Sequence, residues 1–187
     1  MSEIVLVRHG ETAWTLSRQH TGHTDIPLTD RGREQARALA AELAGRQFAL
    51  VLSSPLSRAL ETCRLAGLGA HAAERDELME WDYGAYEGRT TLEIRQERPG
   101  WTLWHDGVPD GETAAEVGAR VDRIVAELRA AAGDAAVFGH GHALRVLAAR
   151  WLGLEPAAGR LFALDPASIS SLGYERETPV VRLWNRR

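Results

Sequence analysis

The sequence contains no lysine: all 22 of its basic residues are arginine. This absence excludes Schiff-base chemistry and a nucleotide-binding P-loop, because both depend on a lysine amine. There is a single cysteine, Cys63, so the chain can form neither an intramolecular disulfide nor a cysteine-based zinc cluster. Because Cys63 lies in an apolar helical pattern, we expect it to be buried and unreactive.

Long apolar runs and basic blocks are missing as well. No apolar run approaches the length that spans a bilayer, and the first residues lead directly into a predicted strand rather than a signal peptide. We therefore expect a cytoplasmic protein that does not bind membranes. The formal net charge of −4, without a basic block, gives no support to nucleic-acid binding. A length of 187 residues, 44% hydrophobic and 26% charged, predicts a single globular domain over residues 1–187.

Strand and helix patterns alternate along the chain. Short apolar runs typical of buried strands are Ile4–Val7, Phe48–Leu52 and Ala135–Phe138, with a short edge strand at Ala70–Ala73 and a final strand pair at Ser168–Tyr174 and Val180–Trp184. Helical patterns run from the N-cap Thr29 to Gly45, from Ser54-Pro55 through Cys63, over Thr91–Arg98, from Thr113 along the stripe Val117, Val121, Ile124, Val125 and Leu128, and over Leu144–Leu152. The segments 11–28, 78–88 and 101–111 are expected to be irregular. This alternation predicts an α/β fold with a largely parallel sheet.

Polar residues follow each of the three buried strands. Arg8 and His9 end the first strand, Ser54 follows the second with Arg58 in the next helix, and His140 follows the third. An open α/β sheet binds its ligand outside the carboxyl ends of its strands. Arginine suits phosphate oxygens, and histidine is a nucleophile or an acid/base near neutral pH. The combination predicts a phosphate pocket that contains a nucleophile.

These residues lie in four motifs: RHGET, SSPLSRALET, LMEWDYGAYEG and GHGHALR, in that order. The motifs resemble those of the histidine phosphatase superfamily, also called phosphoglycerate mutase-like, and the match runs nearly end to end. The small bacterial acid phosphatases and the sedoheptulose-bisphosphatase-like branch are the most similar members. The resemblance implies a three-layer α/β/α sandwich with a largely parallel central sheet.

The resemblance also implies a role for each catalytic residue. His9 is the nucleophile that forms a phosphohistidine, Arg8, Arg58 and His140 hold the phosphoryl oxygens, and Glu80 donates a proton to the leaving oxygen. Phosphoryl transfer depends mainly on positioning and on stabilising charge around the equatorial oxygens. Since arginines supply this charge, we expect neither a metal nor a cofactor.

Further residues stand where relatives contact the substrate. They are Thr15, His20, Thr21, Gly22, Ser54, Tyr83, Gly141 and Arg145. Trp14, Trp101 and Trp104 are either a wall of the pocket or ordinary packing. His140 and His142 together suggest a metal pair, but no acidic residue accompanies them. For His142 we therefore expect a structural or supporting role.

The predicted function is that of a metal-independent phosphomonoesterase acting on small phosphorylated metabolites, sugar phosphates or bisphosphates among them. A phosphoglycerate mutase is a rival within the same family, disfavoured because the chain lacks the mutases' large insertion after the acidic loop and their ordered tail. Thr15 also replaces the asparagine of many mutases. Two rivals from different classes are a non-catalytic module that binds phosphorylated ligands and a hydrolase with a histidine-bound metal. The oligomeric state stays open, with a homodimer as one option.

Overall fold

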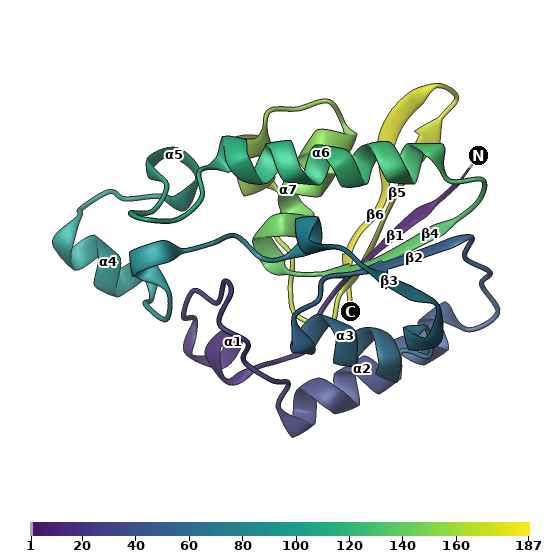
Figure 1. The fold of residues 1–187 in the computed structure, drawn as a ribbon, viewed down its shortest axis with the longest axis horizontal. Helices are drawn as coiled ribbons and strands as arrows, with labels where there is room; N and C mark the ends of the chain where they lie inside the picture. Colours follow the sequence, from purple (N-terminus) through teal and green to yellow (C-terminus); the bar gives the residue numbers. More distant parts are fainter. Residues whose placement is uncertain (1) are drawn as a thin grey trace.

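A central six-stranded sheet organises the computed structural model, which describes residues 2–187 (Figure 1). The strands are β1 (Ile4–Arg8), β2 (Leu50–Ser53), β3 (Ala72–Glu74), β4 (Ala135–Gly139), β5 (Ile169–Glu175) and β6 (Thr178–Arg186). Their order is β3-β2-β4-β1-β5-β6. The first four strands in this order are parallel, whereas β5 is antiparallel to both β1 and β6. The predicted largely parallel sheet is confirmed.

Helices cover both faces of the sheet. They are α1 (Ala13–Ser17), α2 (Asp30–Leu43), α3 (Ser57–Leu65), α4 (Thr91–Glu97), α5 (Leu103–Asp106), α6 (Ala114–Ala130) and α7 (Gly141–Trp151). Short 3₁₀ helices occupy Gly69–His71, Asp76–Leu78, Gly84–Tyr86 and Pro156–Leu161. Figure 1 shows α2 and α3 on one side of the sheet and α6 and α7 on the other. This arrangement confirms the three-layer α/β/α sandwich.

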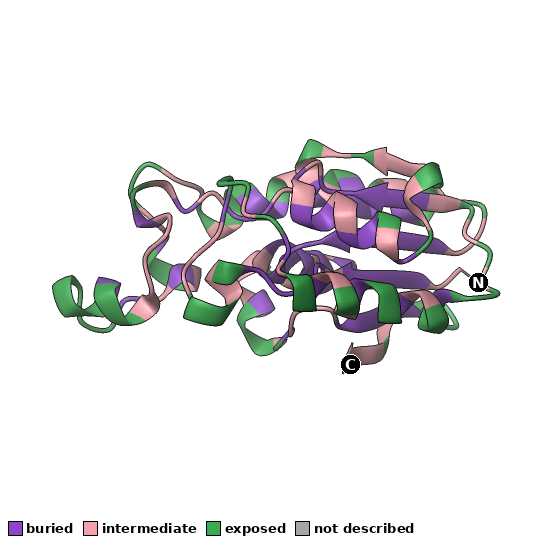
Figure 2. Ribbon diagram, turned by 90° about the horizontal axis from the view of Figure 1, so that it is seen from below, coloured by how far each residue is buried: buried purple, intermediate pink, exposed green. Residues whose placement is uncertain are grey.

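Alternate residues of β1 enter two separate cores. Ile4 and Leu6 pack into the larger core with apolar side chains of α6 and α7, whereas Val5 and Val7 pack with those of α2 and α3. All four side chains are fully buried, as the period of two along a strand requires for a sheet covered on both faces. Figure 2 shows this buried layer inside the more exposed helices.

The helices α2, α4 and α6 each begin at a threonine whose side chain caps the first turn. The Thr29 hydroxyl accepts a hydrogen bond from the Gly32 amide at 3.0 Å and begins α2. Thr90 and Thr113 begin α4 and α6 with capping boxes, because each is followed by a glutamate that bonds back to its amide. The predicted apolar stripe of α6 is buried along its whole length.

Among residues 2–187, none of the helices combines the length and the apolar character needed to cross a bilayer.

One predicted helix start is wrong. Ser54 does not cap α3, which begins at Ser57 after Leu56, and no side chain caps this end. The Ser54 hydroxyl instead lies 2.7 Å from Nε2 of His140, so it takes part in the site rather than in the helix. The hydroxyl also accepts from the Leu56 amide at 3.3 Å, but Leu56 is itself the N-cap residue, so this bond belongs to the turn before α3 and does not cap the helix.

The irregular segments contain short helices that the sequence does not predict. Thr12 forms a capping box with Thr15 and begins the five-residue α1, and α5 lies within the segment 101–111. Such short helices show no apolar period, so the sequence pattern does not reveal them. The predicted edge strand at Ala70–Ala73 exists as β3, displaced to Ala72–Glu74 because a 3₁₀ turn occupies Gly69–His71.

Trp151 is the largest apolar side chain that α7 contributes to the core, and we expect its replacement by alanine to be costly. The ring is fully buried, and its Nε1 donates to the Gly173 carbonyl at 3.2 Å. Trp151→Ala should lower the free energy of unfolding by about 3–5 kcal/mol, because it leaves a large cavity. Urea denaturation measures this loss. Trp184→Ala on the edge strand β6 is the matched control and should cost clearly less; equal losses would contradict the assignment of Trp151 to the core.

Candidate active site

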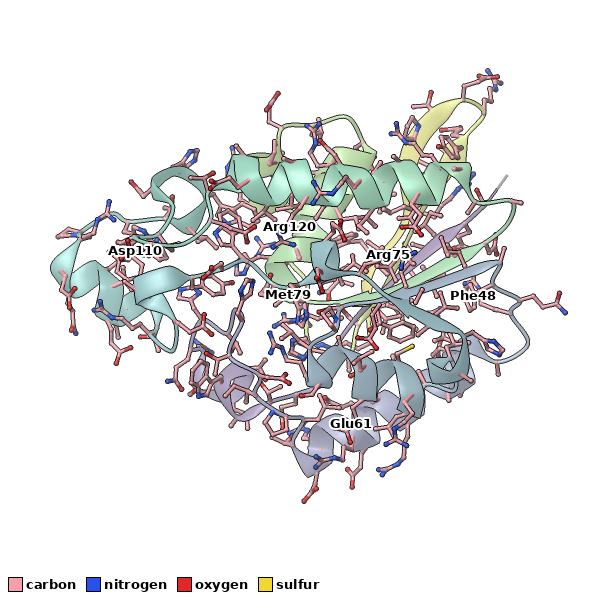
Figure 3. The ribbon with its side chains drawn as sticks, in the orientation of Figure 1. Phe48, Glu61, Arg75, Met79, Asp110 and Arg120 are labelled. Atoms are coloured by element: carbon pink, nitrogen blue, oxygen red, sulfur yellow. The ribbon has the colours of Figure 1, made fainter. Side chains whose placement is uncertain are left out.

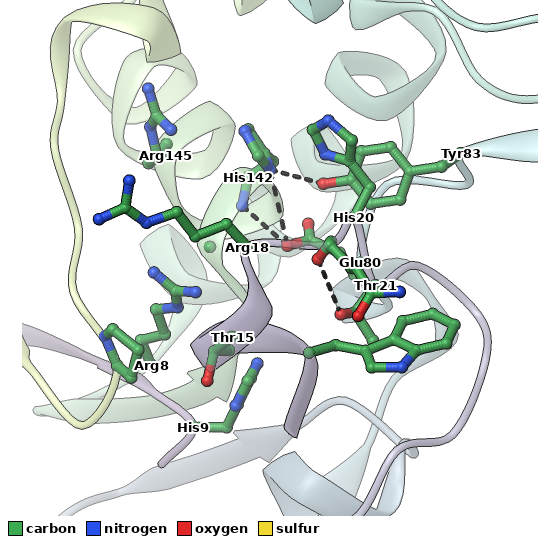
Figure 4. A pocket seen from close by; sticks show the side chains of 14 residues that line it. Arg8, His9, Thr15, Arg18, His20, Thr21, Glu80, Tyr83, His142 and Arg145 are labelled. Atoms are coloured by element: carbon green, nitrogen blue, oxygen red, sulfur yellow. Dashed lines mark hydrogen bonds and ion pairs between the residues drawn. The ribbon is translucent and has the colours of Figure 1, made fainter. Parts of the chain in front are cut away.

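A cavity of about 270 Å³ opens where β1 and β4 end (Figure 4). Its lining comes from Arg8, His9, Trp14, Thr15, Arg18, Gln19, His20, Thr21, Glu80, Tyr83, Gly141, His142, Arg145 and Pro166. Parallel strands bring their carboxyl ends to one edge of the sheet, so the end of β1 and the start of α7 meet there. The cavity therefore lies where the sequence predicted a phosphate pocket.

His9 lies at the floor of this cavity and is only 4% exposed. Its Nδ1 lies 2.7 Å from the carbonyl oxygen of Gly10. A carbonyl oxygen can only accept a hydrogen bond, so Nδ1 carries the proton and the lone pair of Nε2 is free. Burial, together with the guanidinium groups of Arg58 and Arg8, holds the pKa of His9 well below its usual value. The imidazole is thus neutral and nucleophilic at Nε2.

Arg8 packs beside His9 against the first residue of α7. One of its guanidinium nitrogens donates to the Leu164 carbonyl. A Cβ on Gly141 would lie 3.2 Å from Cζ of Arg8, so glycine leaves room for the guanidinium. Within residues 2–187, Arg8 Nε is the one buried side-chain nitrogen or oxygen atom without a hydrogen-bond partner. Nη2 also has no partner in the described chain and is not buried, so it is the nitrogen of Arg8 that an anion in the cavity can reach.

His140 is fully buried behind His9, and the two ring centroids are 5.2 Å apart. Nε of Arg58 donates to Nδ1 of His140 at 3.1 Å, which makes Nδ1 the acceptor. The remaining ring proton is therefore on Nε2, which donates to the Ser54 hydroxyl at 2.7 Å. Burial and the Arg58 charge hold the pKa of His140 well below its usual value. His140 is thus a neutral donor.

Arg58 is fully buried and does not line the cavity. Besides its bond to His140, its guanidinium donates to the carbonyl oxygens of Gly22 at 2.7 Å and Thr24 at 3.0 Å. The nearest carboxylate, that of Asp25, is 3.9 Å away. The observed contacts make Arg58 a support for His140 and for the loop after α1. Its predicted contact with phosphoryl oxygens stays a prediction.

Glu80 lies across the cavity from His9 and is 5% exposed (Figure 4). Its carboxylate accepts three backbone N–H bonds, from Trp81 at 2.9 Å, His142 at 3.0 Å and Ala143 at 2.8 Å. His142 and Ala143 belong to the first turn of α7, where the free N–H groups and the helix dipole favour a carboxylate. The start of α7 therefore fixes Glu80 in the cavity.

Arg120 of α6 supports the backbone on which Glu80 stands (Figure 3). Its guanidinium donates to the carbonyl oxygens of Glu77 and Met79 at 2.7 Å each and to that of Glu80 at 3.1 Å. It also forms a bidentate pair with the Glu112 carboxylate, at 2.7 and 2.9 Å. A planar guanidinium meets all these acceptors at once, which a lysine amine would not do.

The structure brings most of the predicted substrate-binding residues to the cavity. Thr15, His20, Thr21, Tyr83, Gly141 and Arg145 line it. Ser54 and Gly22 lie behind it: Ser54 bonds to His140, and Gly22 fits where a Cβ would come within 2.6 Å of the Trp81 carbonyl oxygen. Neither has a place on the cavity wall.

The three tryptophans differ in their place. Trp14 lines the cavity, whereas Trp101 and Trp104 pack outside it.

The sequence did not predict that Arg18 and His142 line the cavity. Arg18 adopts a left-handed backbone conformation with φ of 60°, which no sequence period indicates. For His142 a signal exists in GHGHALR, but the pattern favours a structural role.

An α/β/α fold that brings Arg8, His9 and the start of α7 to one cavity, opposite a buried glutamate, has the architecture of a histidine phosphatase. The sequence model of the histidine phosphatase superfamily (branch 1) matches residues 4–187, and the chain belongs to this family. It is therefore an enzyme of the phosphatase class.

Similarity to individual proteins agrees with this membership. The chain is 43% identical over 177 residues to an acid phosphatase of Mycobacterium tuberculosis, which covers 92% of this chain and 86% of that protein. It is 37% identical over 183 residues to the sedoheptulose 1,7-bisphosphatase of Saccharomyces cerevisiae, with 80% and 67% covered. A solved structure of a Mycobacterium tuberculosis open reading frame superimposes with a TM-score of 0.93 at 39% identity, covering 99% of this chain and 97% of the other.

Buried neutral histidines make the stability of this fold depend on pH. Burial holds the pKa of His9, His140 and His142 well below the usual value and lowers that of His20 to about 4. Below about pH 6.5 the unfolded chain binds protons that the folded chain does not. The free energy of unfolding should therefore fall with decreasing pH, by up to about 1.4 kcal/mol per pH unit for each such histidine.

His20→Gln isolates one of these contributions. Between pH 6.5 and 4.5 the slope of unfolding free energy against pH should be shallower in the variant by about 1 kcal/mol per unit. Chemical denaturation at several pH values measures both slopes, with His71→Gln on the surface as the control. Equal slopes in His20→Gln and the unsubstituted protein would show that His20 takes up its proton in the folded state as well.

Proposed function

We propose that the chain is a single-domain, metal-independent phosphomonoesterase that hydrolyses small phosphorylated metabolites through a phosphohistidine on His9. The observation that carries the proposal is the proton on Nδ1 of His9. Nδ1 lies 2.7 Å from the Gly10 carbonyl oxygen and donates this proton to it, so the lone pair of Nε2 is free for attack. The guanidinium of Arg8, which lines the same cavity, supplies positive charge for an anionic phosphoryl group.

In the first step, Nε2 of His9 attacks phosphorus and the ester P–O bond breaks. Glu80, which takes up a proton from solvent before this step, gives that proton to the leaving oxygen, which departs as an alcohol. In the second step, a water attacks phosphorus, Glu80 takes up its proton, and the P–N bond breaks to release phosphate. Arg8 stabilises the equatorial oxygens, and Arg58 adds positive charge from behind His140. The Nε2–H of His140 donates to Ser54 in this structure, so it would bind a phosphoryl oxygen only in exchange for that partner.

Positive charge beyond the phosphoryl site supports anionic metabolites as substrates. Arg18 and Arg145 line the same wall of the cavity as Arg8, and Glu80 is the only acidic residue among the lining residues of the described chain. Arg145 is held in place by the Gly159 carbonyl at 3.0 Å and by the face of Trp104. We infer that sugar phosphates or bisphosphates fit this wall.

A cytoplasmic location and a homodimer stay predictions of the sequence.

His9→Ala should abolish hydrolysis, because no other side chain on the cavity floor has a free nitrogen lone pair. Reactions with ³²P-labelled substrate that are quenched in alkaline detergent, which preserves the acid-labile P–N bond, should contain labelled His9 in the unsubstituted protein and no label in the variant. A chelator should leave the rate unchanged, and added bisphosphoglycerate should not be required. Substantial residual activity in the variant would place the nucleophile elsewhere, loss of activity with chelator would support a metal hydrolase, and a bisphosphoglycerate requirement would support a mutase.

Glu80→Gln should slow the hydrolysis of alkyl phosphates far more than that of p-nitrophenyl phosphate. An alkoxide needs a proton to leave, whereas p-nitrophenolate hardly does, and general acid catalysis contributes about 10²–10⁴-fold. The ratio of kcat/KM for the two substrates is the measurement. Glutamine keeps the size of Glu80, but its NH2 group cannot accept the N–H bond at the second oxygen. That loss acts on both substrates alike, so structural damage alone would lower both rates equally. That outcome would make Glu80 a structural residue.

A further inference from the structure

His142 lines the cavity, and the steps proposed above do not use its ring. The ring lies in the first turn of α7 among aromatic side chains, with centroids 5.3 Å from Trp104 and 5.9 Å from Tyr83. Its side chain is 22% exposed. A polar ring held this firmly at the wall of a binding cavity is placed to contact a ligand.

Tyr83 fixes the proton of this ring. The Tyr83 hydroxyl lies 2.6 Å from Nδ1 of His142 and has no other acceptor within residues 2–187. Tyr83 is only 2% exposed, so a phenolic hydrogen without an acceptor would be costly there. The hydroxyl therefore donates to Nδ1, and the ring proton of His142 is on Nε2. Burial raises the pKa of Tyr83 and lowers that of His142, which keeps both groups neutral.

The Nε2–H of His142 is free to bind a ligand. No residue of the described chain accepts a hydrogen bond from it, and Arg8 Nε is the one buried side-chain polar atom there that lacks a partner. The Nε2 atom of His142 is therefore accessible. Because the residue lines the cavity, this donor is available to a bound molecule.

The residue that carries this donor stands beside the group that protonates the leaving oxygen. The backbone N–H of His142 donates to Oε2 of Glu80 at 3.0 Å, and Nδ1 of the ring is 3.9 Å from the same oxygen (Figure 4). An ester oxygen that receives a proton from Glu80 therefore has the imidazole of His142 as a close neighbour. The atoms nearest to that imidazole are those of the leaving group.

We propose that His142 is a specificity-determining residue whose Nε2–H binds an oxygen next to the ester oxygen of the leaving group. Tyr83 is the positioning residue that keeps the proton on Nε2. The inference rests on the proposed function, and it names the substrate class: phosphate monoesters of polyols or hydroxy acids, which carry such a neighbouring oxygen. Aryl phosphates lack this oxygen and gain nothing from the donor.

Two isosteric variants separate the two ring nitrogens. The amide of asparagine reaches the position of Nδ1, and that of glutamine reaches the position of Nε2. The measurement is the kcat/KM ratio of glycerol 2-phosphate to p-nitrophenyl phosphate. His142→Asn should lower this ratio about tenfold, the scale of one lost hydrogen bond in a desolvated site. His142→Gln should retain most of it.

Tyr83→Phe tests the positioning role. It should lower the same ratio by a smaller factor than His142→Asn, because the ring proton is then shared between both nitrogens. The double variant should equal His142→Asn alone, since the effect of Tyr83 passes through His142. Trp104→Phe changes the packing around the ring but not its hydrogen bonds, and it keeps an aromatic face against Arg145, so it should leave the ratio unchanged.

An unchanged ratio in a folded His142→Asn, or an equal fall in Trp104→Phe, would overturn the inference. If His142→Asn does not fold, the kcat/KM ratio of the two substrates in Tyr83→Phe is the test, and an unchanged ratio there would also overturn the inference. Labelling of His9 separates this result from the proposed function. A protein that forms phosphohistidine with an unchanged ratio refutes only the role of His142. A protein that forms none refutes the proposed function itself.

Discussion

The hydrogen bonds of the buried Arg58 guanidinium connect three distant segments of the chain. Nε holds His140 at the end of β4, and the terminal nitrogens hold the carbonyl oxygens of Gly22 and Thr24 in the loop after α1. A buried cation without a close carboxylate needs acceptors on every side, and main-chain carbonyls supply them here. One side chain thus sets the tautomer of His140 and the course of the loop that forms one side of the cavity.

Glu87, in the segment 78–88, holds the other side of the loop after α1. Glu87 accepts hydrogen bonds from the amides of Gly22 at 2.8 Å and Thr24 at 3.3 Å, while the carbonyls of these residues face Arg58. Gly22 has no room for a side chain between Glu87 and Trp81. A carboxylate on the amides and a guanidinium on the carbonyls fix the backbone of the loop in one orientation. The loop and the segment that carries Glu80 are therefore positioned together.

The sequence predicts the fold well because strand burial and helix caps are local signals. Runs such as Ile4–Val7 are read directly from their apolar residues, and Thr29 begins α2 as predicted. Ser-Pro before a helix usually marks a cap, whereas the Ser54 hydroxyl bonds to a histidine 86 residues away. The cavity position of Arg18 depends on a left-handed backbone residue, and the tautomer of His142 depends on a tyrosine 59 residues distant. Interactions of this range leave no period in a sequence.

The cavity concentrates positive charge that the protein itself does not neutralise. Arg8 and Arg145 are half-buried at the cavity and Arg58 is fully buried outside it, and desolvation lowers the pKa of all three, although the Glu80 carboxylate opposes this shift. Desolvation weakens the folded state, because charged groups lose water without gaining full counter-charge. The same desolvation strengthens the attraction for a phosphoryl oxygen, whose charge arrives with the substrate and is already surrounded by fixed donors. Arg8 shows this exchange locally: it lines the cavity and its guanidinium donates to one protein acceptor, the Leu164 carbonyl, so most of its charge is left for the reacting phosphate.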